Sequence, residues 1–338
     1  MKIGTNSQLR LAKRPEGEAG PDDFEVTRDP MPSPGDGEVL IECHLLSVDP
    51  SSRTHWNAGQ SYRSMVQVGQ VIDVGVAGRV LESNHADFAT GDYVVGPGGI
   101  HEFGVVHGDQ LTLCDTRIAP LSSWLGGLSM TGLTAYFGLL EIGQPKPGET
   151  VLITAASGAV GMVAGQIARI KGARAVGVAG TDEKCRFLVN ELGFDAAVNY
   201  KADTLYGDLR EATPDRVDVI FDNVGGPLLD TLFRRLGIGA RIIVSGATSQ
   251  YNNETIYGPT NYLALATMRA RMEGFIIFDY ENRYQAARAE MIEWLKRGDL
   301  KLFENMVDGE VGDYPNVLHR LYEGANVGKM LLRLPAAN

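Results

Sequence analysis

Residues 155–161 have the composition of a turn that binds phosphate groups. They read Ala-Ala-Ser-Gly-Ala-Val-Gly and lie between an apolar run at 151–153 and a helical pattern of apolar residues. The segment matches the pattern G-x-G-x-x-G, with Ala156 at the first glycine position. Gly158 would let the backbone approach a pyrophosphate, and Gly161 would let helix and strand pack closely. Because backbone N–H groups at a helix start attract anions, the segment predicts a dinucleotide site rather than a plain strand–helix turn.

The residues after the second predicted strand indicate which dinucleotide would bind. An NAD site usually has Asp or Glu at the end of that strand, where it holds the ribose 2′-OH. Here the strand at 175–179 is followed by Gly180, and Lys184 lies in the first turn of the next helix. A lysine there can pair with a 2′-phosphate, although it could also only balance the two acidic residues before it. Tyr200, after the third strand, could cover the same phosphate or simply pack. We therefore predict NADP rather than NAD.

The cysteines and histidines do not form the pattern of a metal site. Zinc sites need Cys or His ligands at close spacing, but the three cysteines lie far apart. The six histidines form no H-x-x-H or H-E-x-x-H motif, and the adjacent pair His101-Glu102 is expected in a surface turn. We therefore expect no metal. An odd, dispersed set of cysteines also argues against a disulfide framework and favours a reducing compartment.

Two different patterns of elements follow one another along the chain. Up to about residue 125, short β-like runs alternate with Gly- and Pro-rich turns, which predicts an irregular β-rich domain. From about residue 130, strands and helices alternate, which predicts a doubly wound parallel sheet of the α/β class. The strands expected there are 151–153, 175–179, 196–198, 217–221, 241–244 and 275–277, with helices near 182–192, 203–212, 227–236, 259–269 and 281–297.

Length, charge and hydropathy exclude several classes of function. A chain of 338 residues can hold two domains with sizeable cores. Its net charge of −11 argues against nucleic-acid binding, which needs a basic face. No apolar run approaches the length of a membrane span, and the first residues lack the apolar core of a signal peptide. We expect a cytoplasmic protein with no membrane or nucleic-acid partner.

A set of motifs in a fixed order covers nearly the whole chain. They are Arg14-Pro15, Ser47-Val48-Asp49-Pro50, the run Met-Thr-Gly-Leu-Thr-Ala-Tyr at 130–136, 155–161, 182–184, 193–195, 222–226, 249–252, 274–277 and 326–329. As an ordered set they resemble the zinc-independent medium-chain dehydrogenase/reductases. The resemblance is specific to the group of prostaglandin reductases, alkenal double-bond reductases and bacterial curcumin reductase.

The resemblance implies a division of the chain into two domains. Residues 1–127 and 302–338 would form a GroES-like domain for substrate and catalysis. Residues 128–301 would form the Rossmann NADP-binding domain, and the active cleft would open between the two. Members of the group are usually dimers, often through the edge strand of the Rossmann sheet, so the resemblance also implies a homodimer.

The residues implied to bind NADP(H) follow the carboxyl ends of the parallel strands, where ligands bind in such sheets. They are Gly158, Ala159, Val160, Gly161, Gly180, Lys184, Tyr200, Asn223, Ser245, Tyr251, Phe275, Ile276, Ile277 and Asn326. Those from 158 to 161 would hold the pyrophosphate, and those from 180 to 200 the adenosine ribose with its 2′-phosphate. Those from 245 to 277 would lie along the nicotinamide end, and Asn326 would reach in from the returning chain.

The reaction of the group is reduction of a carbon–carbon double bond next to a carbonyl. Hydride from NADPH adds to the β-carbon, and the negative charge that develops on the carbonyl oxygen needs a hydrogen-bond donor. Tyr251 is the candidate catalytic residue for that task or for proton relay; its alternative role is to hold the cofactor. Two other functions stay open, an NADPH quinone reductase and an NADPH-binding protein without turnover.

Two departures from the group concern the substrate pocket. The group often continues Asp-Pro with Tyr-Met-Arg, but this chain has Ser51-Ser52-Arg53. Because that tyrosine usually faces substrate, Ser51 predicts a wider or more polar pocket, and the group's substrates are not carried over. A tryptophan expected near Gly99-Ile100 is also missing. Tyr62 could line the pocket, although a structural role is the stronger expectation.

Overall fold

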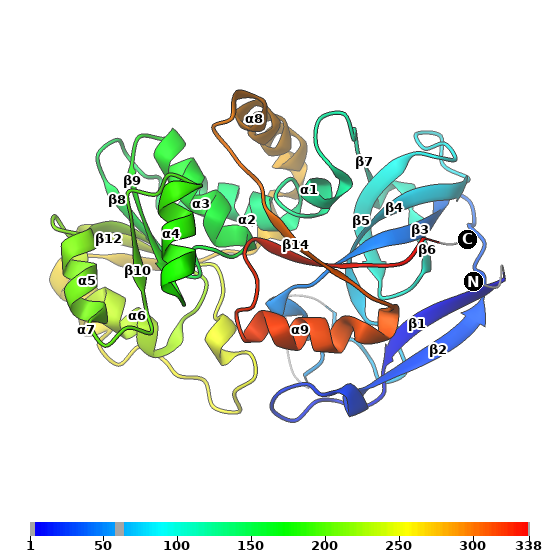
Figure 1. The fold of residues 1–338 in the computed structure, drawn as a ribbon, viewed down its shortest axis with the longest axis horizontal. Helices are drawn as coiled ribbons and strands as arrows, with labels where there is room; N and C mark the ends of the chain where they lie inside the picture. The colour runs from blue at the N-terminus through cyan, green and yellow to red at the C-terminus, as the bar shows by residue number, and fades with distance from the viewer. Residues whose placement is uncertain (1–3, 58–63, 337–338) are drawn as a thin grey trace. The chain divides into compact units, whose positions relative to one another are not determined.

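The computed structural model describes residues 4–57 and 64–336, which form two compact units (Figure 1). The first unit consists of Met1–Gly126 together with Glu304–Asn338, and the second consists of Gly127–Phe303. The first unit is therefore made from two separate stretches of chain. Among the described residues, none of the helices has the length and apolar character needed to span a membrane.

The second unit is built on a six-stranded parallel sheet in the order β10-β9-β8-β11-β12-β13. Its strands are β8 (Thr150–Ile153), β9 (Arg174–Ala179), β10 (Ala196–Asn199), β11 (Val217–Asp222), β12 (Leu236–Val244) and β13 (Arg271–Gly274). Strand β8 is buried at every residue, as expected for a strand covered on both faces. The order reverses between β8 and β11, so the predicted doubly wound sheet is confirmed.

Helices cover this sheet through apolar side chains. They are α2 (Met130–Phe137), α3 (Ala159–Ile170), α4 (Asp182–Asn190), α5 (Leu205–Ala212), α6 (Gly226–Phe233), α7 (Leu263–Met268) and α8 (Tyr284–Arg297). Helices α5, α6 and α7 share one core with the sheet, to which they contribute Leu209, Leu232 and Leu265. Helices α3 and α4 pack around Phe194 and Leu188, which fill the space left by Gly165 and Gly177.

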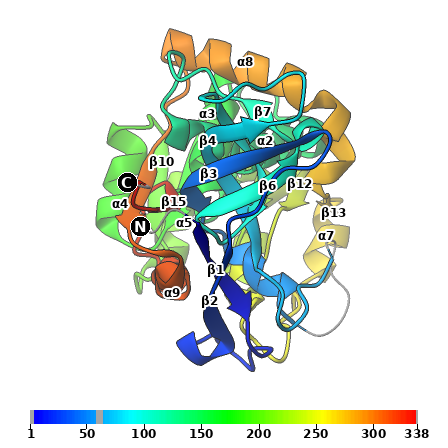
Figure 2. The same ribbon diagram turned by 90° about the vertical axis from the view of Figure 1, so that its right-hand side faces the viewer.

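The first unit is rich in β-structure, and in the part of it that the structure describes the main sheet has seven strands, with β6 paired to β3. Its strands are β1 (Thr5–Leu11), β2 (Phe24–Pro30), β3 (Glu38–Ser47), β4 (Asp73–Ser83), β5 (Tyr93–Gly99), β6 (Phe103–His107), β7 (Thr112–Leu113), β14 (Glu304–Asp308) and β15 (Lys329–Arg333). Strands β1 and β2 pair separately, as Figure 2 shows. Strand β15 lies between β14 and β3, so the late part of the chain completes the sheet begun by the early part (Figure 1). Helices α1 (Leu121–Leu125) and α9 (Tyr314–Tyr322) belong to the same unit.

The prediction of a strand at 275–277 is wrong. The observed strand β13 lies just before it at Arg271–Gly274, and all four of its residues are exposed. An exposed edge strand needs no apolar residues, so its sequence carries no strand signal. The apolar run that follows is half-buried, and Ile277 begins a 3-10 helix (Ile277–Arg283).

The packing of α3 on Phe194 gives a stability prediction. A Cβ on Gly165 would lie 1.9 Å from the Phe194 ring, so Gly165→Ala overpacks this site and is expected to cost about 1–3 kcal/mol. Gly207 in α5 is the matched control, because a Cβ there meets nothing within 4 Å. Gly207→Ala should instead stabilise by about 0.5–1 kcal/mol. Urea denaturation checks both variants, and equal midpoints would contradict the packing argument.

Candidate functional site

The predicted cofactor-binding residues of the second unit all follow the carboxyl ends of its parallel strands. They come after β8, β9, β10, β11, β12 and β13 in turn. These ends share one edge of the sheet, and because the strand order reverses between β8 and β11, the loops after these two strands flank a topological switch point. The sheet therefore brings together thirteen of the fourteen residues, all except Asn326, at one edge.

The turn between β8 and α3 has the close packing that a phosphate-binding turn needs. Ala155 has a positive φ of 47°, and its carbonyl accepts a hydrogen bond from the Gly158 N–H at 2.9 Å. A Cβ on Gly161 would lie 2.4 Å from the same carbonyl oxygen, so only glycine fits there. Gly158, Ala159 and Val160 are half-buried, which leaves the start of α3 accessible to a ligand.

The neighbouring strand explains why alanine is tolerated at the first glycine position. Ala156 is fully buried, and its N–H donates to the Val178 carbonyl at 3.0 Å. A Cβ on Gly177 of β9 would lie 3.0 Å from the Ala156 Cβ and 2.7 Å from Leu188. The missing side chain on β9 thus makes room for the methyl group of Ala156.

A buried carboxylate at the end of β11 ties three strand-end loops together. Asp222 is 1% exposed and accepts hydrogen bonds from the Thr154 hydroxyl at 2.8 Å and the Gly225 N–H at 3.0 Å. Its backbone carbonyl accepts from the Ser245 N–H at 2.9 Å. Burial raises the pKa of Asp222, and the hydrogen bonds from Thr154 and the backbone oppose that shift. The loops after β8, β11 and β12 are therefore held in fixed positions relative to one another.

Asn223 has a structural role in this network. It is 8% exposed, its N–H donates to the Thr154 hydroxyl at 2.8 Å, and its side-chain amide donates to the Thr154 carbonyl at 2.8 Å. The sequence motifs predict Asn223 as a cofactor contact and assign no role to Thr154. The signal for Thr154 was its position directly after the buried strand.

Two lysines and a tyrosine gather beyond the end of β9. A Cβ on Gly180 would lie 3.2 Å from the Tyr200 ring and 3.6 Å from the Lys201 side chain. The Lys201 ammonium lies 5.8 Å from the centre of the Tyr200 ring, which is 42% exposed. Burial and the charge of Lys201 lower the pKa of Lys184. The structure thus places the predicted residues Gly180, Lys184 and Tyr200 in one accessible, positively charged cluster.

Lys201 was missed by sequence analysis, although it directly follows Tyr200. Its charge acts on Lys184, so the cluster has two ammonium groups where one was expected. Of the two acidic residues before Lys184, Glu183 opposes the lowering of the Lys184 pKa. Asp182 instead accepts a hydrogen bond at 2.8 Å from the Asn199 side chain, at the end of β10. This bond joins the end of β10 to the start of α4, the helix that carries Lys184.

Tyr251 lies on the loop 245–261, which connects β12 to α7. Its phenol oxygen accepts a hydrogen bond from the Ala247 N–H at 3.2 Å, and a Cβ on Gly246 would lie 3.0 Å from it. Ser245 begins the loop and is fixed to the carbonyl of Asp222. The phenol of Tyr251 therefore lies directly over the backbone that leaves β12, and the residue is half-buried.

The segment after β13 uses part of its backbone internally. The Ile276 carbonyl accepts from the Asp279 N–H at 3.1 Å, and the Ile277 carbonyl accepts from the Tyr284 hydroxyl at 2.9 Å. A Cβ on Gly138 would lie 2.7 Å from the Phe275 ring, so this ring packs against the α2 side of the unit. These bonds fix the course of residues 275–277 along the strand ends.

The remaining residues singled out from the sequence, Asn326, Ser51 and Tyr62, belong to the first unit. Asn326 is 7% exposed, and its amide donates to the Gly328 carbonyl at 2.7 Å. Ser51 is half-buried in a 3-10 helix (Pro50–His55), where its carbonyl accepts from the Thr54 hydroxyl. Tyr62 lies outside the described residues.

A buried ammonium fixes the motif that precedes Ser51. Lys329 is 2% exposed and donates to the Val48 carbonyl and to the Asp49 carboxylate, each at 2.7 Å. Because a buried charge needs a partner, these bonds hold β15 to the chain that leaves β3. Two motifs that lie far apart in the sequence are therefore in direct contact.

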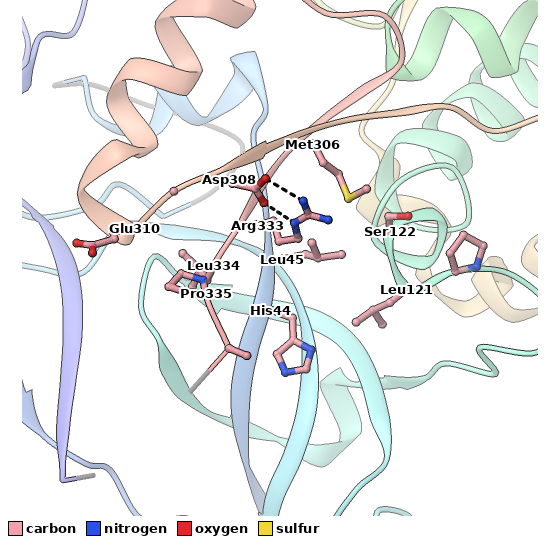
Figure 3. A pocket seen from close by; sticks show the side chains of 13 residues that line it. His44, Leu45, Leu121, Ser122, Met306, Asp308, Glu310, Arg333, Leu334 and Pro335 are labelled. Atoms are coloured by element: carbon pink, nitrogen blue, oxygen red, sulfur yellow. Dashed lines mark hydrogen bonds and ion pairs between the residues drawn. The ribbon is translucent and has the colours of Figure 1, made fainter. Parts of the chain in front are cut away.

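A groove of about 870 Å³ lies on the first unit (Figure 3). His44, Leu121 and Met306 contribute to its lining, and Asp308 pairs with Arg333 across part of it. The groove contains no residue of the predicted site.

Within residues 4–57 and 64–336, no group of three or more His, Cys, Asp or Glu side chains is arranged to hold a metal ion.

The prediction of a surface turn at His101-Glu102 is wrong. His101 is half-buried, forms an isolated β-bridge with Gln8, and has a ring nitrogen that accepts from the Gly99 N–H at 3.3 Å. Burial lowers the pKa of His101 to about 4, which keeps the ring neutral.

Two family models match the chain. Residues 7–114 match the N-terminal domain of oxidoreductase, and residues 159–297 match the family described as zinc-binding dehydrogenase. These segments lie in the first and second units respectively.

Relatives match over nearly the full chain. The NADPH-dependent curcumin reductase of Escherichia coli (strain K12) is 40% identical over 97% of both chains. The NADP⁺-dependent 2-alkenal reductase of Nicotiana tabacum is 38% identical over 88% of both. The crystal structure of CurA in complex with NADPH from Vibrio vulnificus superposes with a TM-score of 0.92 at 37% identity, covering 98% of this chain and 100% of that one. This chain therefore belongs to the zinc-independent reductase group of the medium-chain dehydrogenase/reductases, with a Rossmann and a GroES-like domain.

Proposed function

We propose that this protein is an NADPH-dependent reductase of carbon–carbon double bonds conjugated to a carbonyl. The observation that carries the proposal is full-length similarity to reductases named for curcumin and for 2-alkenals. The second unit would bind NADP(H), and the first unit, at 1–127 and 302–338 in the predicted division, would supply the substrate side. The polar residue Ser51 favours a pocket of different shape from one lined by tyrosine.

The residues at the strand ends fit NADP(H). The close approach of Gly161 to the Ala155 carbonyl shapes a tight turn before α3, and a pyrophosphate would bind at the start of that helix. Lys184 and Lys201 would bind the 2′-phosphate, and Tyr200 would lie against it. Because each charged contact to a phosphate is stronger than a neutral hydrogen bond, this cluster favours NADPH over NADH.

The lysine cluster gives a prediction of cofactor preference. Lys184→Ala should lose about 1.5–3 kcal/mol of catalytic efficiency with NADPH and little with NADH, and Lys201→Ala should show the same pattern more weakly because Lys201 is exposed. Lys296→Ala on α8, where the ammonium pairs with Glu293, is the matched control and should change neither. Steady-state kinetics with both cofactors measure the effect. Equal efficiency of the unaltered protein with NADH and NADPH would refute the assignment.

We propose that Tyr251 is the residue that acts on the substrate. When bound, NADPH supplies the hydride that adds to the β-carbon. The phenol of Tyr251 would donate its O–H to the substrate carbonyl oxygen as negative charge develops there. The Ala247 N–H donates to the same phenol oxygen at 3.2 Å, which orients the ring and polarises its O–H bond. The proposal thus gives Tyr251 the task of stabilising an enolate.

The position of the transferred hydrogen distinguishes double-bond reduction from alcohol formation. With NADPH deuterated at the 4R or 4S position, we expect the label on the β-carbon of an enone, with the carbonyl intact. Mass spectrometry and NMR of the product locate the label. Deuterium on the carbonyl carbon would require a different reaction class.

The phenol of Tyr251 is tested by removing its hydroxyl. Tyr251→Phe should lower kcat for enones by roughly 10- to 1000-fold, as for loss of one oxyanion donor, while the KM for NADPH changes much less. Tyr206→Phe, on α5 beneath Arg234, is the matched control and should retain activity. If the KM for NADPH rises while saturated kcat stays constant, Tyr251 only anchors the cofactor.

We also propose that two copies pair through strand β13 in the cytoplasm. Strand β13 is an edge of the parallel sheet, and Met272 on it is 36% exposed. Ile238 and Leu263, on neighbouring elements of the same unit, are 69% and 66% exposed. Exposed edges with apolar side chains favour strand pairing. The thiols of Cys43, Cys114 and Cys185 are not joined in disulfides, which fits a reducing compartment.

A further inference from the structure

The loop 245–261 is attached to helix α6 through one acidic residue. The carboxylate of Asp230 accepts hydrogen bonds from the Tyr257 hydroxyl at 2.7 Å, the Thr260 hydroxyl at 2.6 Å and the Thr260 N–H at 3.0 Å. Its backbone carbonyl accepts from the Asn261 side chain at 2.7 Å. The loop is thereby closed onto the helix that follows the Asp222 network.

These polar bonds act where apolar burial is small. Ile256 is 68% exposed and Tyr257 is 38% exposed, so the outer part of the loop has little hydrophobic packing. A segment with few buried apolar contacts opens at low free-energy cost unless other bonds hold it. A carboxylate is a stronger acceptor than a neutral group, which suits Asp230 to that task.

A chain of contacts runs from Asp230 toward Tyr251. Tyr257, bonded to Asp230 through its hydroxyl, also donates its N–H to the Gln250 side chain at 2.8 Å. Gln250 is 5% exposed and donates to the Ser249 hydroxyl at 2.7 Å, which donates in turn to the Val224 carbonyl. Gln250 immediately precedes Tyr251, so the same bonds that order the outer loop fix the backbone at Tyr251.

We propose that Asp230 is a positioning residue that holds the phenol of Tyr251 in place. By binding Tyr257 and Thr260 it fixes Gln250, and Gln250 fixes the adjacent Tyr251 against the Ala247 N–H. The catalytic consequence rests on the proposed function, because it requires the phenol to act on substrate. The structural part does not, because the bond between Tyr251 and Ala247 can be measured without turnover.

Hydrogen exchange of the Ala247 amide is the direct test, since that N–H donates to the Tyr251 phenol. In NMR exchange on the full chain, Asp230→Ala is expected to speed exchange at Ala247 by about 10-fold or more, as Tyr251→Phe should. The kcat for enones should fall by about 10-fold with a smaller change in the KM for NADPH, because misplacing a reacting group costs rate. Asp230→Asn keeps one carbonyl acceptor and should lie between.

The matched control is Asp208→Ala in α5. Asp208 also accepts a hydroxyl bond, from Thr204 at 2.7 Å, but on a helix that does not hold this loop. It should change neither readout. In Asp230→Ala/Tyr251→Phe, turnover no slower than in Tyr251→Phe alone supports action through Tyr251, and additive losses overturn it. Wild-type exchange at Ala247 in Asp230→Ala also overturns the proposal. If the unaltered protein reduces no enone, the proposed function fails while the exchange result still decides whether Asp230 positions Tyr251.

Discussion

The organisation of the second unit depends on the buried carboxylate of Asp222. A charge removed from water is stable only when hydrogen bonds replace the lost hydration, and here Thr154, Val224 and Gly225 supply them. Each donor comes from a loop that has just left a buried strand. The requirement to satisfy one carboxylate therefore sets the relative positions of the loops on both sides of the point where the strand order reverses.

Two different kinds of constraint surround this network. The turn before α3 is shaped by contact between backbone atoms, since Gly161 lies too close to Ala155 for any side chain. The loop that carries Tyr251 is instead shaped by polar bonds along an exposed segment. The first arrangement suits a rigid seat for a phosphate group, because steric contact allows little movement. The second depends on hydrogen bonds to a carboxylate, which are stronger than bonds between neutral groups.

Sequence patterns predicted the features that depend on local spacing. The turn between β8 and α3 was predicted because its glycines, strand and helix are contiguous, and the parallel sheet because its buried strands are apolar. The strand β13 was misplaced because an exposed edge carries no such signal. Asp230 escaped notice because its partner Tyr257 is 27 residues away, a separation that no helical or strand period encodes. The structural role of Asn223 was also not predicted, because its hydrogen-bond partner Thr154 is distant in the sequence.

The position of β15 between β14 and β3 has a consequence for synthesis on the ribosome. Lys329 bonds to the Val48 carbonyl across 281 positions, so β3 lacks this neighbour until nearly all of the sequence has emerged. The second unit, which is contiguous, can fold first, as domains generally do during translation. Throughout that interval the first unit presents an open strand edge to other nascent chains. Its protection then depends on the speed of elongation and on chaperones rather than on its own finished sheet.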